Sequence, residues 1–281
     1  MLLYNTTRGV AASQQPLDAL RLLPGISWDD LFLARQSMDE LKRLFDEASP
    51  LDGTDAASAE NLLLAPIGTQ EVWAAGVTYL RSRTARMEES ATSGGSQFYD
   101  KVYNAHRPEL FFKATPHRVV GHGARMTLRR DSNWLVPEPE LALAFNHRGR
   151  LVGYTVANDL SSRDIEGENP LYLPQAKVFD RCAALGPGLL LTGEYPGTST
   201  AIQISIRRGG VEAFRGETSI AQMKQTFENL REHLFRYNSF PNGCYLMTGT
   251  GVVPSDDFSL APGDEVAITI PEVGTLTNVM D

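Results

Sequence analysis

The sequence predicts an α+β fold that is rich in strands, with a small α/β domain at its N-terminus. Short apolar stretches separated by glycine- and proline-containing turns recur from residue 72 to residue 270, which is typical of many short strands. Few segments show the three-and-four spacing of an amphipathic helix. The 281 residues suffice for one large and one small domain, and 42% hydrophobic residues is an ordinary globular value.

Residues 1–70 are expected to form the small domain. Residues 37–40 have the form of a capping box, and Leu41, Leu44 and Phe45 then make one apolar helix face. This part of the chain carries no pattern typical of a reactive site. We therefore interpret it as a packing or dimerisation element.

Residues 71–281 are expected to form the second domain. Its clearest helix is predicted from Ser219 to Tyr237, where Ile220, Met223 and Phe227 begin a three-and-four spacing. The predicted strands cover residues 72–79, 151–157, 189–191, 201–207 and 265–270, with a further strand starting at 109.

The segment 80–105 differs from its surroundings because it is polar and is broken by glycine and serine at positions 93–96. A long segment of this kind is either a disordered loop or an active-site lid. Composition does not decide between these two. A functional site nearby would favour the interpretation that residues 80–105 form a lid.

Charge and composition exclude several classes of partner. The formal net charge is −8 and the isoelectric point is near 5.2, so we expect no nucleic-acid partner. The sequence has no basic amphipathic stretch of the kind that binds membrane surfaces, and residues 1–5 lack the basic start of a signal peptide. We expect a cytoplasmic protein, in which Cys182 and Cys244 are buried thiols.

Three carboxylates predict a metal site in the stretch from 134 to 187. Glu138 and Glu140 are two residues apart in an apolar run, so on a strand they point to one face. Asp159 ends the next predicted strand, and oxygen ligands of this kind suit a hard cation such as Mg²⁺. Arg163 and Lys177 follow, as an anion clamp and a base that would suit chemistry beside a carbonyl group.

The alternative for the glutamate pair is an exposed strand face, which is the usual place for two glutamates two apart. The apolar run 141–145 argues against exposure. Pro137 and Pro139 remove backbone donors and favour an irregular edge strand that faces a cavity. A dinucleotide-binding loop at 249–251 is rejected, because the third glycine is missing and Pro254 stands where a helix should begin.

Taken together, six motifs in this order resemble the fumarylacetoacetate hydrolase family over roughly residues 70–281. They are Glu-x-Glu at 138–140, Gly-Tyr-Thr-Val-Ala-Asn-Asp at 153–159, Ser-Arg-Asp at 162–164, Lys177 before Phe179-Asp180, Thr-Gly-Thr at 248–250 and Leu-x-Pro-Gly-Asp at 260–264. No single motif is specific, but their combined order is.

The resemblance implies a β-rich mixed roll that works as a homodimer or a higher oligomer such as a homotetramer. It implies Mg²⁺, for which Mn²⁺ or Ca²⁺ can substitute, and a small 2-keto acid as the substrate. Mapped by motif, the metal ligands are Glu138, Glu140 and Asp159, the active-site lysine is Lys177, the substrate contacts are Arg163 and Thr250, and the lid is 80–105.

The segment 168–177 resembles one branch of that family, the 2-keto-3-deoxy sugar-acid dehydratases of the 2-keto-3-deoxy-D-arabinonate type. These enzymes convert a 2-keto-3-deoxypentonate to 2-oxoglutarate semialdehyde. The family's hydrolases and decarboxylases carry a His-x-x-Glu dyad for which this chain has Ser82 and Ala85. The departure removes the pair that activates water and leaves Ser82 as a substrate-binding candidate.

We therefore predict a Mg²⁺-dependent lyase that dehydrates its substrate through a metal-stabilised enolate. Lys177 is the predicted base at C3, because burial and a neighbouring cation both disfavour its charged form. Glu109 is the predicted proton carrier at C4. The alternative is that Glu109 and Lys113 are solvent-exposed residues at the two ends of one strand, which is the usual place for such charges. Two alternatives stay open, a metal-dependent C–C bond hydrolase and a non-catalytic binder of keto acids.

Overall fold

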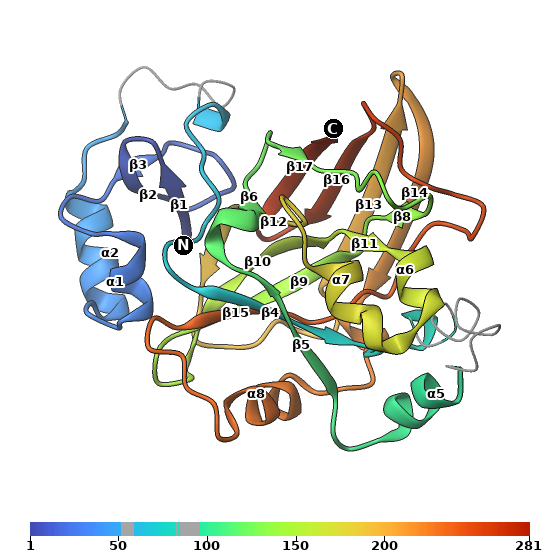
Figure 1. Ribbon diagram of the computed structural model, residues 1–281. Helices are drawn as coiled ribbons and strands as arrows, with labels where there is room; N and C mark the ends of the chain where they lie inside the picture. The colour runs from blue at the N-terminus through green and yellow to red at the C-terminus, as the bar shows by residue number, and fades with distance from the viewer. Residues whose placement is uncertain (52–58, 83, 85–95) are drawn as a thin grey trace.

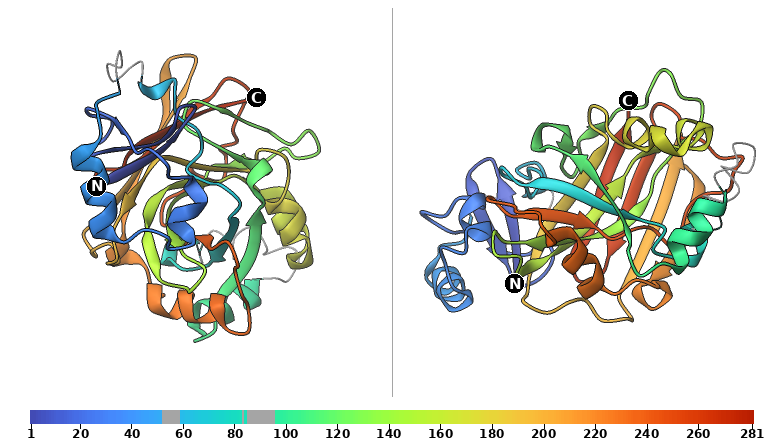
Figure 2. Two further views of the ribbon diagram at one scale, coloured as in Figure 1. Left: turned by 90° about the vertical axis from the view of Figure 1, so that its left-hand side faces the viewer. Right: turned by 60° about the horizontal axis from the view of Figure 1, so that its bottom comes forward.

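The computed structural model describes residues 1–51, 59–82, 84 and 96–281. The described residues form three β-sheets, and β1–β3 lie beside α1 and α2 at one side of the molecule, whereas β13 and β14 lie at the opposite side (Figure 1). Figure 2 gives two further views of this arrangement. The prediction of a strand-rich α+β fold is confirmed. Most of the predicted lid at 80–105 lies outside the described residues, which omit 83 and 85–95.

The largest sheet has ten strands, in the order β3-β2-β1-β12-β10-β9-β15-β4-β5, with β6 also paired to β12. Along the chain these strands are β1 Leu2–Thr6, β2 Gly9–Ser13, β3 Arg21–Leu22, β4 Glu71–Gly76, β5 Glu109–Ala114, β6 Val119–Val120, β9 Pro139–Phe145, β10 Leu151–Asp159, β12 Ala183–Leu191 and β15 Cys244–Met247.

The second sheet has five strands in the order β14-β13-β16-β17-β7, and β8 and β11 form a two-stranded ladder. Their bounds are β7 Arg125–Met126, β8 Leu135–Val136, β11 Ser161–Ser162, β13 Ala201–Arg208, β14 Val211–Ser219, β16 Glu265–Ile270 and β17 Gly274–Met280.

The helices are short and lie outside the sheets (Figure 1). They are α1 Trp28–Phe32, α2 Met38–Glu47, α5 Ser96–Asn104, α6 Arg163–Glu168, α7 Leu173–Lys177 and α8 Phe227–Phe235, with 3₁₀ turns η1 Pro116–Arg118, η2 Pro170–Tyr172 and η3 Ile220–Gln222. The predicted capping box is present at α2, where the Ser37 hydroxyl accepts the Glu40 N–H and the Glu40 carboxylate accepts the Ser37 N–H.

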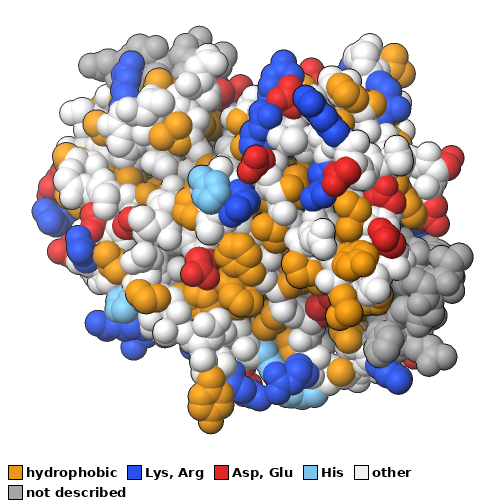
Figure 3. All heavy atoms as spheres, viewed as in Figure 1, with side chains coloured by type: hydrophobic (Ala, Val, Ile, Leu, Met, Phe, Trp, Pro, Cys, Tyr) orange, Lys and Arg blue, Asp and Glu red, His pale blue; other side chains and the backbone are white. Residues whose placement is uncertain are grey.

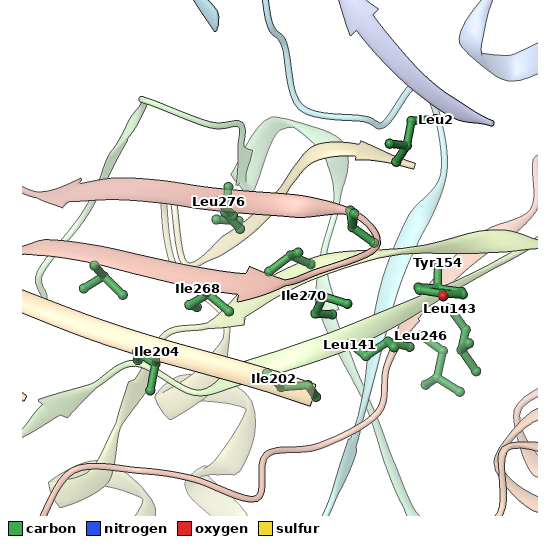
Figure 4. Close-up of a cluster of buried hydrophobic side chains, with 14 of the residues drawn as sticks. Leu2, Leu141, Leu143, Tyr154, Ile202, Ile204, Leu246, Ile268, Ile270 and Leu276 are labelled. Atoms are coloured by element: carbon green, nitrogen blue, oxygen red, sulfur yellow. The ribbon is translucent and has the colours of Figure 1, made fainter. Parts of the chain in front are cut away.

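The main core lies between the two large sheets. All seven residues of β9 are buried. Leu141 and Leu143 pack in one cluster with isoleucines such as Ile204 of β13 and Ile268 of β16, and Figure 4 shows this layer of side chains. Ala142 and Ala144 belong to a second cluster, because alternate residues of a strand point to opposite faces. Glu138 and Glu140 therefore share the face of Ala142, which lies away from the five-stranded sheet.

Two sequence-based predictions need correction. Pro137 and Pro139 do not mark a sheet edge, because β9 begins at Pro139, which pairs with Asn158, and lies between β10 and β15. The predicted helix 219–237 begins only at Phe227. Thr226 caps it by accepting the Asn229 N–H, so the apolar residues before it serve the separate turn η3.

The N-terminal part is continuous with the large sheet, since β1 pairs with β12 as well as with β2. The division of the chain at residue 70 stays a prediction. Within the described part of the chain, no helix is long and apolar enough to cross a membrane. On the face drawn in Figure 3, acidic and basic side chains are interspersed.

Candidate functional site

The antiparallel register of β9 and β10 brings three predicted metal ligands together. Ala157 pairs with Glu140, so Asp159 lies opposite Glu138, whose carbonyl oxygen accepts the Asp159 N–H at 3.0 Å. One carboxylate oxygen from each of Glu138, Glu140 and Asp159 lies within 4.8 Å of the others. All three residues line a cavity and are buried.

Lys177 reaches this cluster from the end of α7. Its Nζ donates to Glu138 Oε2 at 2.7 Å, to Asp159 Oδ2 at 3.1 Å and to Ser161 Oγ at 2.6 Å. Lys177 is fully buried and lines the cavity. The ammonium therefore lies among the oxygens that are predicted to bind the metal.

Arg163 begins α6, and its Nη2 donates to Glu138 Oε1 at 2.9 Å. Arg163 was predicted to contact the substrate, and it does line the cavity, but its guanidinium is engaged with a predicted metal ligand. Glu166, one turn further along α6, lies 4.0 Å from Arg163 Nε and 3.6 Å from Lys177 Nζ. Glu166 was not among the predicted site residues; its i,i+3 spacing from Arg163 on one helix was the available signal.

Lys113 was assigned to a solvated strand end, and that assignment is wrong. It lies in β5, is fully buried, and forms an ion pair of 2.6 Å with Asp159 Oδ1. The available signal was the apolar pair 111–112 before it, which is unusual at an exposed strand end.

The loop after β15 holds the third carboxylate. The Gly249 N–H donates to Glu140 Oε2 at 2.6 Å. Gly249 has a φ of +94°, and a Cβ there would lie 1.9 Å from the Thr78 hydroxyl, so the position requires glycine. Thr250 lines the cavity next to it, with its hydroxyl donating to the Val252 carbonyl at 2.9 Å.

Ser82 also lines the cavity, after the chain leaves β4 at Val77, which has a φ of 54°. Its hydroxyl donates to the Tyr79 carbonyl at 2.8 Å and accepts the Tyr79 N–H at 3.1 Å. The hydroxyl of Ser82 is thus held by backbone groups, and its predicted role in substrate binding stays a prediction.

Glu109 opens β5, beside the cavity wall. It packs against Gly76, where an added Cβ would lie 2.0 Å from Glu109 Oε2. Gly76 lines the cavity together with the carboxylates. Glu109 itself is not among the residues that line the cavity, and its role as a proton carrier stays a prediction.

The environment separates the carboxylates electrostatically. Burial, followed by the charges of Asp159 and Glu138, raises the pKa of Glu140 well above its usual value. Burial also acts to raise the pKa of Asp159, but Lys113 and Lys177 outweigh it, and the pKa of Asp159 is lowered.

The charges of the site favour a divalent cation. The site contains four buried carboxylates and three buried cationic side chains, so its formal charge is one negative charge. The carboxylates are Glu138, Glu140, Asp159 and Glu166, and the cationic side chains are Lys113, Arg163 and Lys177. A divalent ion would reverse that sign and complement an anionic substrate. Three clustered carboxylates are also the hard oxygen donors that Mg²⁺ prefers, so the residues fit this ion.

The comparisons with known proteins agree with the resemblance noted in the sequence. The family model for the fumarylacetoacetate (FAA) hydrolase C-terminal domain matches residues 72–281. A probable 2-keto-3-deoxyxylonate dehydratase of Haloferax volcanii is 43% identical over 247 residues, which are 88% of this chain and 83% of the relative. A 2-dehydro-3-deoxy-D-arabinonate dehydratase of Saccharolobus solfataricus is 44% identical over 213 residues, or 75% and 72% of the two chains.

A solved structure has the same fold. That of 2-keto-3-deoxy-D-arabinonate dehydratase complexed with magnesium and 2,5-dioxopentanoate superposes with a TM-score of 0.84 and 34% identity, covering 100% of this chain and 98% of the other. The predicted β-rich roll is therefore confirmed.

Proposed function

The chain belongs to the fumarylacetoacetate hydrolase family, and we propose that it is a Mg²⁺-dependent lyase that dehydrates a 2-keto-3-deoxypentonate to 2,5-dioxopentanoate, that is, 2-oxoglutarate semialdehyde. The observation that carries the proposal is the convergence of three carboxylates and a buried lysine on one cavity. Two dehydratases above 40% identity and a related complex with Mg²⁺ and 2,5-dioxopentanoate support it.

Glu138, Glu140 and Asp159 would hold Mg²⁺. When bound, Mg²⁺ would polarise the 2-keto group and stabilise the negative charge that develops when a C3 proton is removed. The Gly249 N–H fixes Glu140, and Arg163 fixes Glu138, so both ligands are oriented by the protein.

Lys177 is the residue we assign to the C3 proton. Its side chain is in the cavity wall, within hydrogen-bond distance of two predicted ligands, and so beside the place where the keto group must lie. In its neutral form the amine accepts the proton, and the electron pair of the C–H bond becomes the C2–C3 double bond of an enolate.

Loss of the C4 hydroxyl completes the elimination. The enolate electrons form a C3–C4 double bond as the C–O bond breaks, and a proton from Glu109 converts the leaving hydroxide to water. The resulting unsaturated 5-hydroxy-2-keto acid then isomerises: C5 loses a carbon-bound proton and C3 gains one, which gives an enol with a C4–C5 double bond. Loss of the enol hydroxyl proton and gain of a proton at C4 give the saturated keto aldehyde. No activated water is required, which fits the bonding of the Ser82 hydroxyl to the Tyr79 backbone.

The direct test is turnover by the purified protein with Mg²⁺. We expect a 2-keto-3-deoxypentonate to yield 2,5-dioxopentanoate, and we expect chelation of Mg²⁺ to abolish the reaction. Cleavage of an acylpyruvate without dehydration of any 2-keto-3-deoxy acid would instead indicate the hydrolase. Binding of keto acids without turnover of either substrate would indicate the binder.

We also propose that the protein is a cytoplasmic homo-oligomer, as the family resemblance implies. Light scattering coupled to size exclusion measures the assembly directly. A monomer at the concentrations used for the activity assay would contradict the proposed assembly without affecting the proposed chemistry.

A further inference from the structure

The chain has only five lysines, and two of them are fully buried at this site. Lys177 lines the cavity. Lys113 is not among the described residues that line the cavity. A buried ammonium is costly unless charged or polar partners surround it, so the partners of Lys113 indicate what it does.

Three oxygens surround the Lys113 ammonium. Asp159 Oδ1 lies 2.6 Å from Nζ, the Leu160 carbonyl accepts at 3.0 Å, and the Lys177 carbonyl accepts at 2.5 Å. The ammonium thus donates hydrogen bonds to two backbone carbonyls and forms an ion pair with the Asp159 carboxylate. These partners hold Lys113 behind the cavity, which it does not line.

The three acceptors belong to two segments that the site must hold together. Asp159 and Leu160 lie at the end of β10, whereas the Lys177 carbonyl lies at the end of α7. Asp159 turns Oδ1 to Lys113 and Oδ2 to the Lys177 ammonium. One side chain thus sets both the rotation of a predicted ligand and the backbone from which the proposed base extends.

We propose that Lys113 is a positioning residue that couples Asp159 to Lys177. It holds Asp159 so that one oxygen faces the cavity, and it fixes the distance between the metal site and the base. This inference rests on the proposed function for its catalytic consequence. Its structural part, the orientation of Asp159, is independent of which reaction occurs.

The two lysines should respond oppositely to the same substitution. Removal of a nearby positive charge at unchanged geometry would tighten Mg²⁺ binding, so weaker binding is the signature of lost positioning. For Lys113→Met we expect Mg²⁺ affinity to fall about 10- to 100-fold, the usual effect of removing a group that orients a ligand. For Lys177→Met we expect tighter binding, because Lys177 occupies ligand oxygens that Mg²⁺ would take.

A second readout tests the link to the base. At saturating Mg²⁺, Lys113→Met should exchange the C3 hydrogens of 2-oxobutanoate with deuterated solvent about 10²-fold more slowly, the scale expected when a catalytic group is displaced by about 1 Å. Arg208→Met is the matched control, since Arg208, at the end of β13, forms an ion pair of 2.7 Å with the fully buried Asp264. The control should keep both the Mg²⁺ affinity and the exchange rate of the wild type.

A folded Lys113→Met variant with unchanged or tighter Mg²⁺ binding, or with wild-type exchange, would overturn the inference. The wild type gives a test that needs no variant: with ¹⁵N-labelled lysine, the ammonium signal of Lys113 should persist with and without Mg²⁺, because buried, hydrogen-bonded protons exchange slowly. A Lys113 signal that exchanges as fast as those of the exposed Lys42, Lys101 and Lys224 would also overturn it. Mg²⁺ binding and C3 exchange without dehydration by the wild type would refute the proposed function but leave this inference intact.

Discussion

Lys177→Met should destabilise the Mg²⁺-free protein far more than the Mg²⁺-loaded protein. The Lys177 ammonium contacts Glu138 and Asp159, and all three side chains are at most 7% exposed. Methionine has a similar length but no charge, so the two carboxylates lose a shared cationic partner. Removing one partner of a buried ion pair typically costs about 3–5 kcal/mol, and we expect a loss of that size in the free energy of unfolding without Mg²⁺.

Saturating Mg²⁺ should reduce this loss. Mg²⁺ would bind the same carboxylate oxygens, so the wild type gives up its Lys177 contacts on binding the ion and the variant gives up none. We expect the destabilisation by Lys177→Met to be smaller in saturating Mg²⁺ than without it by at least about 1.4 kcal/mol, which corresponds to tenfold tighter Mg²⁺ binding by the variant. C3 exchange should meanwhile fall by at least about 10²-fold, the lower end of what a general base contributes.

The assay is urea unfolding with a chelator and with saturating Mg²⁺, followed by C3 exchange measured by NMR. Lys224→Met is the matched control, because Lys224 is exposed and its ammonium donates to Asn104. Equal destabilisation with and without Mg²⁺ would refute the competition between Lys177 and the ion. Exchange within a few-fold of the wild type would show that Lys177 is not the base.

Three further predictions concern the other carboxylates. Glu109→Gln should slow dehydration at least about 10²-fold but spare C3 exchange, and loss of both rates would argue against a role confined to C4. Gly76→Ala should reproduce that pattern in a folded protein, because the new Cβ displaces the Glu109 carboxylate; unchanged dehydration would contradict the placement of Glu109. Because the pKa of Glu140 is raised, protons should compete with Mg²⁺ for this carboxylate at pH values above those at which a glutamate usually titrates. Calorimetry should therefore show that Mg²⁺ binding weakens as the pH falls and that binding releases a proton. The Glu140→Gln variant should lose this proton release. In the Mg²⁺-free protein the signs are opposite for two groups: ionised Glu140 costs stability as the pH rises, whereas Asp159, with a lowered pKa, contributes stability that is lost as the pH falls through that value.

The sequence alone was enough to predict the strand-rich class and the three carboxylates. Side chains two apart on a strand share a face whatever the strand packs against, so Glu138 and Glu140 could be paired from spacing. The apolar run after them predicted burial, and all of β9 is buried. The capping box at Ser37 depends on four adjacent residues, and it too could be predicted locally.

Predictions failed where one pattern fits two environments. The apolar residues before Phe227 continue a helical spacing, but they belong to the turn η3. After this turn the Lys224 N–H donates to the Thr78 carbonyl, a contact that no local pattern contains. Pro137 and Pro139 are compatible with an edge strand, yet β9 pairs with β10 on one side and with β15 on the other. In both cases a distant segment determines the hydrogen bonds of the backbone.

The tertiary structure alone decided the roles of Lys113 and Glu166. A lysine at a strand end is exposed unless another segment supplies acceptors, and those of Lys113 come from the ends of β10 and α7. Glu166 likewise depends on α7, which brings Lys177 to within 3.6 Å of its carboxylate. Burial of a charge is favourable only where distant parts of the chain meet to compensate it, so it is a property of the assembled fold and not of the local sequence.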